Sequence, residues 1–482
     1  MQHVNARIIL IAIILTVTVA APFARAGKVP SKMATVLQPN SSPLVSFRLL
    51  FNTGSAFDPK GKEGVAALCA AMLSDGGSRA MSYEQIVESM YPIATEFHSQ
   101  VDKEMTVFYG ATHVDNLQRY YQIILGMLLE PGWREDDFKR LRDDAITFLK
   151  VNLRGNNDEE LGKEALYNFI YQGGHPYRHQ NTGTVESLQK LTLDDVKGFY
   201  REYYTAENFV AGLAGGYPKG FEAKLEGDFA AKLPAGKTAK LTLPEPQKIN
   251  GLEMQVIDKD TAGTAISFGF PIPVNRVHPD WPALLVVQSF LGQHRSSNSY
   301  LYQRLRAIRG LNYGDYAYIE YFPRGMFQFH PDPNLCRQQQ IFQIWIRPVE
   351  LKNGLFTLRA GLYELNKLAK NGLSNENFEA TRQFLTKYVN VLTKAQDEQL
   401  GYALDSRYYG IGNFTDYVRG GLAKLTPEDV NRAIKKYLQA DNVKIVVVTK
   451  DAKAFMQAAV EDKPSPISYT SAPPKEILDE DK

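Results

Sequence analysis

Residues 191–215, LTLDDVKGFYREYYTAENFVAGLAG, recur as residues 425–449, LTPEDVNRAIKKYLQADNVKIVVVT, and the two stretches align without a gap. In each copy a threonine, Thr192 or Thr426, stands three residues before an aspartate, which is the pattern of a helix N-terminal capping box. Pro427 takes the first helical position of the second copy. Both copies then carry an asparagine and a short apolar run that predicts a buried strand. One helix-to-strand unit therefore occurs twice, which predicts a duplicated chain.

The segments that begin the two halves also correspond, although more loosely. Leu44–Asn52 and Thr264–Phe270 have the pattern of strands, and an apolar helix follows each, over Gly64–Leu73 and Pro282–Leu291. Longer amphipathic helices, such as Val114–Glu130, lie within the halves. We therefore predict an α+β fold of two homologous α/β halves, each a mixed and largely antiparallel sheet with helices packed on it.

Composition divides the chain into five parts. Residues 1–26 form a signal peptide, residues 27–232 an N-terminal domain and residues 251–460 a C-terminal domain. Residues 233–250 are rich in Pro, Lys and Thr and are interpreted as the linker between the domains. Residues 461–482 mix Pro, Ser and acids, which predicts a flexible tail.

The N-terminus has the features of a secretory signal. One arginine precedes an apolar or Thr-containing run over Ile8–Ala21, and Ala24-Arg25-Ala26 supplies small residues around a cleavage point. After Gly27 no apolar run approaches the length of about 20 residues that a spanning helix needs. We therefore expect a periplasmic or secreted protein without a membrane anchor after signal cleavage.

Charge and motif content exclude several function classes. Removal of residues 1–26 takes away two arginines and no acid, so the mature chain carries 53 basic and 53 acidic residues. A neutral chain without a basic cluster gives no footprint for nucleic acid or an anionic membrane. Motifs of nucleophilic hydrolases, nucleotide sites and thiol redox centres are absent from the sequence. Cys69 and Cys336 are too few for a disulfide framework; whether they pair stays open, and two free thiols is the default expectation.

The segment Gly54–Gly77, GSAFDPKGKEGVAALCAAMLSDGG, resembles the zinc-motif region of the pitrilysin/insulinase family of inverted zincins. In that family His-x-x-Glu-His lies on a helix, so two His ligands share a face and the Glu activates the metal-bound water. Here Ala67, Ala70 and Ala71 occupy the three motif positions. Alanine offers no lone pair to a metal and no base to a water. The resemblance therefore implies a metallopeptidase-family pseudoenzyme that is inactive alone.

No other segment of the sequence restores a metal site. The resemblance implies a further Glu ligand at about residues 146–151, but that stretch, ITFLKV, contains no acid. Asp143 and Asp144 lie just before it and are interpreted as solvated helix residues. His175 and His179, in GGHPYRHQNTGT, look like the family's His-Pro-Tyr turn, which is not helical and supplies no third ligand. We expect no cofactor in this chain, and zinc only in a partner subunit.

A second family pattern lies in the C-terminal half. Residues 297–313, SNSYLYQRLRAIRGLNY, match Ser-Arg-Leu-Phe-x-x-Leu-Arg-x-x-x-Gly-Leu-x-Tyr at most positions, with Arg306 and Tyr313 in the Arg and Tyr places. The resemblance implies that this pair hydrogen-bonds the substrate backbone, within a clam-like chamber between facing halves. A guanidinium and a phenol suit this task because both donate hydrogen bonds toward an oxygen that gains negative charge.

The same residues also admit a purely structural interpretation. Tyr300–Ile308 has the pattern of a helix that Gly310 stops in a left-handed conformation, and Arg306 near its end suits the helix dipole. Tyr313 then begins an aromatic strand that runs to Tyr321. On spacing alone the structural interpretation of Arg306 and Tyr313 is favoured over a substrate-binding role. The family pattern reverses this preference.

The resemblance extends from about Leu44 to Thr449, and in bacteria members of this family often occur as heterodimers of a zinc-bearing and a zinc-free subunit. The sequence thus predicts the catalytically incomplete, peptide-binding subunit of a periplasmic heterodimeric zinc peptidase. Its partners would be a zinc-bearing homologous subunit and peptide substrates. A stand-alone peptide-binding or scaffold pseudoprotease is the alternative, and an enzyme with a relocated metal site is a third reading. The loop from Gly292, GQHRSSNS, is not glycine-rich and does not support a presequence-processing role.

The purified protein alone is expected to contain no stoichiometric zinc and to cleave no peptide, because three alanines replace two ligands and the general base. Metal analysis of the native protein, together with a peptidase assay on unstructured peptides, checks this expectation. Zinc-dependent hydrolysis by the isolated chain would contradict it.

Overall fold

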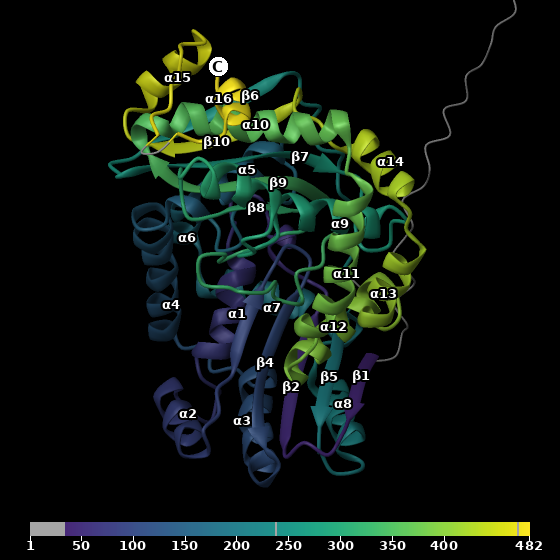
Figure 1. The fold of residues 1–482 in the computed structure, drawn as a ribbon. Coiled ribbons are helices and arrows are strands. Elements are labelled where there is room, and N and C mark those ends of the chain that lie inside the picture. The colour runs from purple at the N-terminus through teal and green to yellow at the C-terminus, as the bar shows by residue number, and fades with distance from the viewer. Residues whose placement is uncertain (1–33, 237–238, 470–471) are drawn as a thin grey trace, which may run out of the picture.

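Two five-stranded sheets organise the computed structural model, which describes residues 34–236, 239–469 and 472–482 (Figure 1). The first sheet has the order β1-β5-β2-β4-β3 and the second β6-β10-β7-β9-β8. Only β1/β5 and β6/β10 pair in parallel. The prediction of two mixed, largely antiparallel α/β halves is confirmed. The strands are β1 (Ala34–Pro39), β2 (Leu44–Phe51), β3 (His98–Val101), β4 (Thr106–His113), β5 (Phe209–Gly215), β6 (Leu252–Asp258), β7 (Gly263–Ile272), β8 (Asp315–Tyr318), β9 (Gln340–Glu350) and β10 (Val443–Thr449).

The repeated unit adopts the same structure in both halves. Helix α7 (Leu193–Tyr203) leads into β5, and α14 (Pro427–Tyr437) leads into β10. Both helices begin with a complete capping box, in which Thr192 or Thr426 exchanges hydrogen bonds with the aspartate three residues on. Every residue of β5 and of β10 is buried. The duplication read from the sequence is therefore confirmed at the level of caps, helices and strands.

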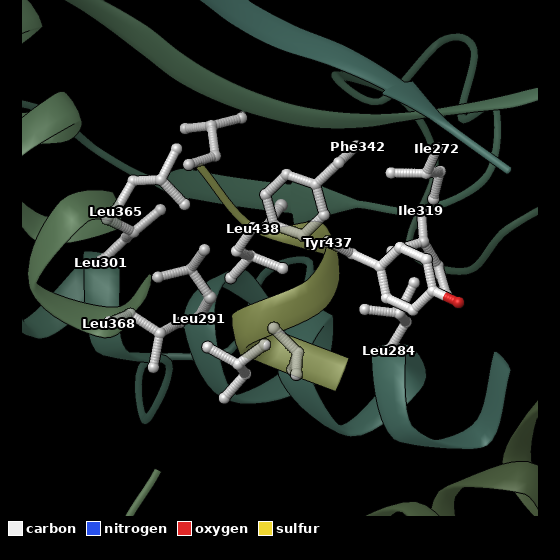
Figure 2. Packing of buried hydrophobic residues seen from close by; sticks show 14 of the residues in the cluster. Ile272, Leu284, Leu291, Leu301, Ile319, Phe342, Leu365, Leu368, Tyr437 and Leu438 are labelled. Carbon is white, nitrogen blue, oxygen red and sulfur yellow. The ribbon is translucent and has the colours of Figure 1, made fainter. Parts of the chain in front are cut away.

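One face of each sheet packs against the helices of its own half. In the first half the alternate residues Val45, Phe47, Leu49 and Phe51 of β2 enter this core. Figure 2 shows part of the corresponding core of the second half, where leucines of α9 and α10 meet Phe342 of β9. The helices are α1 (Val65–Asp75), α2 (Tyr83–Met90), α3 (Leu117–Leu129), α4 (Glu135–Thr147), α6 (Val185–Lys190) and α8 (Phe221–Lys232) in the first half, and α9 (Trp281–Gly292), α10 (Gly354–Asn371), α11 (Asn375–Leu392), α13 (Phe414–Lys424) and α15 (Ala452–Val460) in the second.

The other face of each sheet is covered by a helix from the opposite half. Helix α5 (Asp158–Ile170), from the first half, packs on β7, β9 and β10, where Tyr167 and Ile170 share a buried cluster with Val446. Helix α12 (Gln396–Tyr409), from the second half, packs on β1, β2 and β5, where Leu404 meets Leu50. The two halves are therefore joined by an exchange of helices, in which each half covers one face of the other half's sheet.

This exchange corrects one part of the predicted fold. The resemblance implied a clam-like chamber between the two halves of the chain. In the described residues the inner faces of both sheets are instead packed against α5 and α12, because each half leaves its own inner face uncovered and apolar residues such as Leu50 and Val446 lie on these faces. A chamber that holds peptide would have to lie elsewhere than between these two faces.

A buried polar network adds specificity to the contact between the halves. The Arg337 guanidinium donates to both carboxylate oxygens of Asp102, at 2.8 and 2.5 Å, and both side chains are almost fully buried. Glu104 accepts hydrogen bonds from the Gln338 amide and from the Tyr408 hydroxyl, at 2.6 and 2.7 Å. Each of these contacts joins residues more than 200 positions apart in the sequence. Burial of such charges is tolerated only where partners and hydrogen bonds compensate them.

The end of the chain differs from the flexible tail predicted over residues 461–482. Helix α16 (Lys475–Glu480) docks on the second half, and the side chain of Ile477 is only 2% exposed. Glu480 and Asp481 pair there with Arg304 and Arg309. The composition of residues 461–482 suggested a solvated acidic segment. It did so because composition does not identify the distant arginines that neutralise these acids.

Three further features complete the description. The linker residues 233–236 and 239–250 form no helix or strand, and Leu241 and Leu243 pack beside α5. Cys69 and Cys336 are buried free thiols. Within the described ranges no helix is long and apolar enough to span a bilayer, and the signal peptide predicted over residues 1–26 lies outside those ranges.

Loss of the Asp102 carboxylate is expected to destabilise the folded chain strongly. Asp102→Ala leaves the Arg337 charge buried and uncompensated, which costs about 3–5 kcal/mol of unfolding free energy. The control is Asp260→Ala, which removes the exposed partner of Lys450 and costs less than about 1 kcal/mol. Urea titration of both variants measures the difference, and equal midpoints would contradict the role given to the buried pair.

Candidate functional site

Helix α1 carries the three alanines that replace the zinc motif. Ala67 and Ala71 lie four residues apart and are half-buried, whereas Ala70 is fully buried in the core of the first half. The helix begins at Gly64, whose positive φ of 99° suits glycine. Its first turn is held by Asp58, which accepts hydrogen bonds from the backbone N–H of Gly64 and Ala66 at 2.6 and 2.9 Å. The helix that corresponds to the motif helix of inverted zincins is thus present and capped. Its three motif positions carry apolar side chains.

The segment that would supply the further ligand is also apolar. Helix α4 continues into the π-helical segment η4 (Phe148–Gly155), and Ile146 and Leu149 pack against the same core as Ala71. Asp143 and Asp144 are exposed, and Asp143 bonds to its neighbour Arg142. Over the part of the chain that the structure describes, no group of three His, Cys, Asp or Glu could hold a metal ion. The residues around α1 therefore do not fit zinc.

The histidine pair of the Gly-Gly-His-Pro turn is engaged in separate contacts. His175 Nε2 lies 2.9 Å from Gln339 Oε1, and its ring packs 4.5 Å from that of Tyr171. His179 Nδ1 lies 2.9 Å from the backbone oxygen of Gln180. Burial, assisted by the nearby charge of Lys103, lowers the pKa of His179 to about 4. In the described residues His175 therefore lies at the contact between the halves, and the structure does not bring the two rings together with a third ligand.

Arg306 and Tyr313 lie next to each other on the second half. The Arg306 guanidinium carbon is 5.6 Å from the centre of the Tyr313 ring and 4.7 Å from that of Tyr302. Arg306 belongs to the π-helical segment η6 (Tyr302–Ala307), and such widened turns are frequent at functional sites. The Tyr313 side chain is 76% exposed. The two residues named from the sequence are thus adjacent and accessible, and they do not lie in the filled space between the halves.

The backbone around the pair follows the sequence prediction in part. Gly310 ends the helix with a φ of 66°, and its N–H donates to the Arg306 carbonyl at 2.8 Å, as expected for a left-handed stop. The predicted strand from Tyr313 to Tyr321 is shorter, because β8 covers only Asp315–Tyr318. Tyr313 therefore sits in the turn before the strand and not within it.

Two buried polar residues that sequence reasoning missed shape this turn. The Asn312 amide donates to Asp315 Oδ1 at 2.7 Å and to the Arg347 carbonyl at 3.2 Å, and its oxygen accepts from the Gly314 N–H. Burial raises the pKa of Asp315 to about 7, against the lowering effect of Asn312 and Arg306. The Asn-x-x-Asp spacing is the only local signal for this arrangement, and it is common in turns that carry no function.

Replacement of Asp58 tests how burial acts at the start of α1. Burial raises the pKa of Asp58 to about 8, against the two backbone hydrogen bonds, so the folded chain holds a proton that the unfolded chain releases above about pH 4. Wild type should therefore lose stability relative to Asp58→Asn as the pH rises from 4 to 8, by at most about 1.4 kcal/mol per pH unit. Thermal unfolding across this range measures the difference. The exposed Asp143→Asn should run parallel to wild type, and a parallel curve for Asp58→Asn would contradict the prediction.

Comparison with known proteins identifies the family. The model described as "Insulinase (Peptidase family M16)" matches residues 34–179, and the model described as "Peptidase M16 inactive domain" matches residues 190–385. An uncharacterized zinc protease, YmxG of Bacillus subtilis, is 22% identical over 376 residues, which cover 74% of this chain and 88% of that protein.

One relative is named a non-peptidase homolog. A non-peptidase homolog, YmxG of Helicobacter pylori, is 20% identical over 421 residues, which cover 85% of this chain and 90% of that protein. The solved structure of an M16 inactive domain from Pseudomonas fluorescens has a TM-score of 0.75 at 21% identity, over 87% of this chain and 96% of that one. The matched models, the duplicated fold and the motif positions agree, and the chain belongs to the insulinase family of peptidases, family M16.

Proposed function

We propose that this chain is the catalytically incomplete, peptide-binding subunit of an exported heterodimeric zinc peptidase. In this proposal it supplies Arg306 and Tyr313 to the zinc site of a homologous partner subunit in the periplasm or outside the cell. The observation that carries the proposal is the exposed Arg–Tyr pair on a chain whose own motif helix presents alanines. A site that keeps its oxyanion donors but lacks ligands and general base can act only where another chain completes it.

The chemistry of the pair supports this role. The guanidinium of Arg306 and the phenol of Tyr313 are both hydrogen-bond donors, and they lie side by side. Donors that converge on an oxygen stabilise the negative charge that develops on it during attack on a carbonyl. The packing of the Arg306 guanidinium between the rings of Tyr302 and Tyr313 restricts its orientation before substrate arrives.

The filled interior of the chain favours a chamber between two subunits. In the described residues α5 and α12 occupy the inner faces of the sheets, so these two faces are not open to a peptide. A chamber formed by apposition of this chain and its partner would place the exposed pair at its wall. Such a closed space admits extended peptides and excludes folded proteins.

A stand-alone peptide-binding or scaffold pseudoprotease is the second candidate. Residues of α1 and of the stretch 146–151, the two segments that would hold the zinc ligands, pack into the apolar core of the first half, which favours this candidate. One relative is named a non-peptidase homolog. In that case the Arg–Tyr pair would hold the backbone of a bound peptide that no subunit cleaves.

Reconstitution with a zinc-bearing M16 subunit that copurifies with the native protein tests the proposal. The mixture should hydrolyse peptides, and Arg306→Ala should lower kcat by about 100-fold, the size expected for loss of one oxyanion donor. Tyr313→Phe should lower it by about 10-fold. The matched controls are Arg432→Ala and Tyr91→Phe, which remove exposed side chains far from the pair in sequence.

The controls should leave kcat within twofold of wild type. Equal activity of the mixture with wild type, Arg306→Ala and Tyr313→Phe would refute the proposal. Peptide binding by the chain in the absence of any partner that restores hydrolysis would favour the scaffold role.

A further inference from the structure

Two buried arginines flank Arg306 in sequence. The side chain of Arg304 is 10% exposed and that of Arg309 only 2%, although both lie within three residues of the half-exposed Arg306. Buried guanidinium groups are costly unless carboxylates pair with them in good geometry. The segment that presents Arg306 therefore depends on acids supplied by other parts of the fold.

One of these acids comes from α10 and the others come from the end of the chain. Glu364, which is fully buried, accepts a hydrogen bond from Arg304 Nε at 2.6 Å. Glu480 pairs with Arg304 Nη2, and its other oxygen accepts from Lys367 at 2.7 Å. Asp481 Oδ1 lies 2.8 Å from Arg309 Nη2. Three cations and three carboxylates thus form one compensated cluster.

The acids at the end of the chain are the nearest partners of Arg309. Its guanidinium lies 2.8 Å from Asp481 and 3.3 Å from Glu480, whereas Glu364 is 3.7 Å away. Ile477 of α16 is buried to 2% exposure, so the segment is anchored by an apolar contact as well as by charge. Without residues 475–481, Arg309 would keep only its most distant carboxylate.

Arg309 is connected directly to the backbone that positions Arg306. Its Nη1 donates to the Arg304 carbonyl at 2.9 Å. The next links are the hydrogen bonds from Gly310 N–H to the Arg306 carbonyl and from Leu311 N–H to the Leu305 carbonyl. The π-helical segment η6 is therefore closed at its end by a guanidinium whose own place is set by Asp481 and Glu480.

We propose that Glu480 and Asp481 are positioning residues, which hold the η6 backbone so that Arg306 projects toward a bound peptide beside Tyr313. Neither acid contacts the pair. They act through Arg304 and Arg309, and the tail of the chain is on this account part of the site's support. The inference rests on the proposed function, because its readout is hydrolysis restored by a zinc-bearing partner.

The test compares two charge-neutralising variants in the full chain. Glu480→Gln/Asp481→Asn removes the tail carboxylates of the cluster, and Asp479→Asn is the matched control, because Asp479 pairs only with Lys482 and is 52% exposed. With the zinc-bearing partner, the double variant is expected to lower kcat by about tenfold. KM and the affinity for the partner subunit should stay within twofold, as should every parameter of the control.

A background that lacks Arg306 separates positioning from a general structural effect. If the acids act through Arg306, the double variant should cause less than a twofold further loss when combined with Arg306→Ala, because the group they position is gone. A merely structural role would lower activity by the same factor in both backgrounds, and that additive result would overturn the inference. Unchanged kcat in the double variant would overturn it as well.

Two further outcomes, misfolding of the double variant and failure of the proposed function itself, are separated from the results above. If the double variant does not fold, the single variant Asp481→Asn, which keeps Glu480, is carried through the same comparison, with a threefold loss of kcat as the expected result and no loss as the contrary one. If Arg306→Ala itself leaves restored hydrolysis intact, the proposed function has failed, whatever the tail variants do.

Discussion

The exchange of helices between the two halves is the constraint on which the remaining structure depends. Each sheet buries both of its faces, and the helices of its own half cover only one of them. Helices α5 and α12 cover the others, and the Asp102–Arg337 pair joins the halves beside them. Neither half could be removed without exposing the inner face of the other to water. The chain is therefore one folding unit built from a duplicated sequence.

This constraint decides where function can reside. Over the described residues α5 and α12 cover the inner faces of the sheets, so we look for the candidate residues on the accessible surface. Arg306 and Tyr313 meet that condition, because the structure places them side by side with the tyrosine exposed. The alanines of α1 offer no chemistry of their own. An accessible donor pair on a chain whose motif helix carries alanines is the arrangement that the proposed function expects of a subunit that completes another chain's site.

The sequence predicted those features whose signals are local. The capping boxes of Thr192 and Thr426, the buried strands after them and the left-handed stop at Gly310 were each specified by a few neighbouring residues. Arg306 and Tyr313 were identified from a family pattern whose Arg-to-Tyr part spans eight positions. Such short patterns predict local structure well because their residues are neighbours along the backbone.

Contacts between distant segments were beyond this kind of reasoning. Nothing near Glu480 indicates that it will meet Arg304, and the acidic composition of the last residues suggested a solvated tail. The residues of α5 do not by themselves indicate which sheet the helix will cover. The chamber was misplaced for this reason. Buried charges such as Asp102 and Arg337 are equally hidden, since either residue alone has the pattern of a surface position.

The most direct measurement is a structure of the complex between this chain, a zinc-bearing partner in which the general base has been replaced, and an uncleaved peptide. The account predicts that the Arg306 guanidinium and the Tyr313 hydroxyl lie within about 3 Å of backbone oxygens of the peptide beside the partner's zinc site. A complex in which both side chains face solvent, or in which the peptide is bound without either of them, would contradict it.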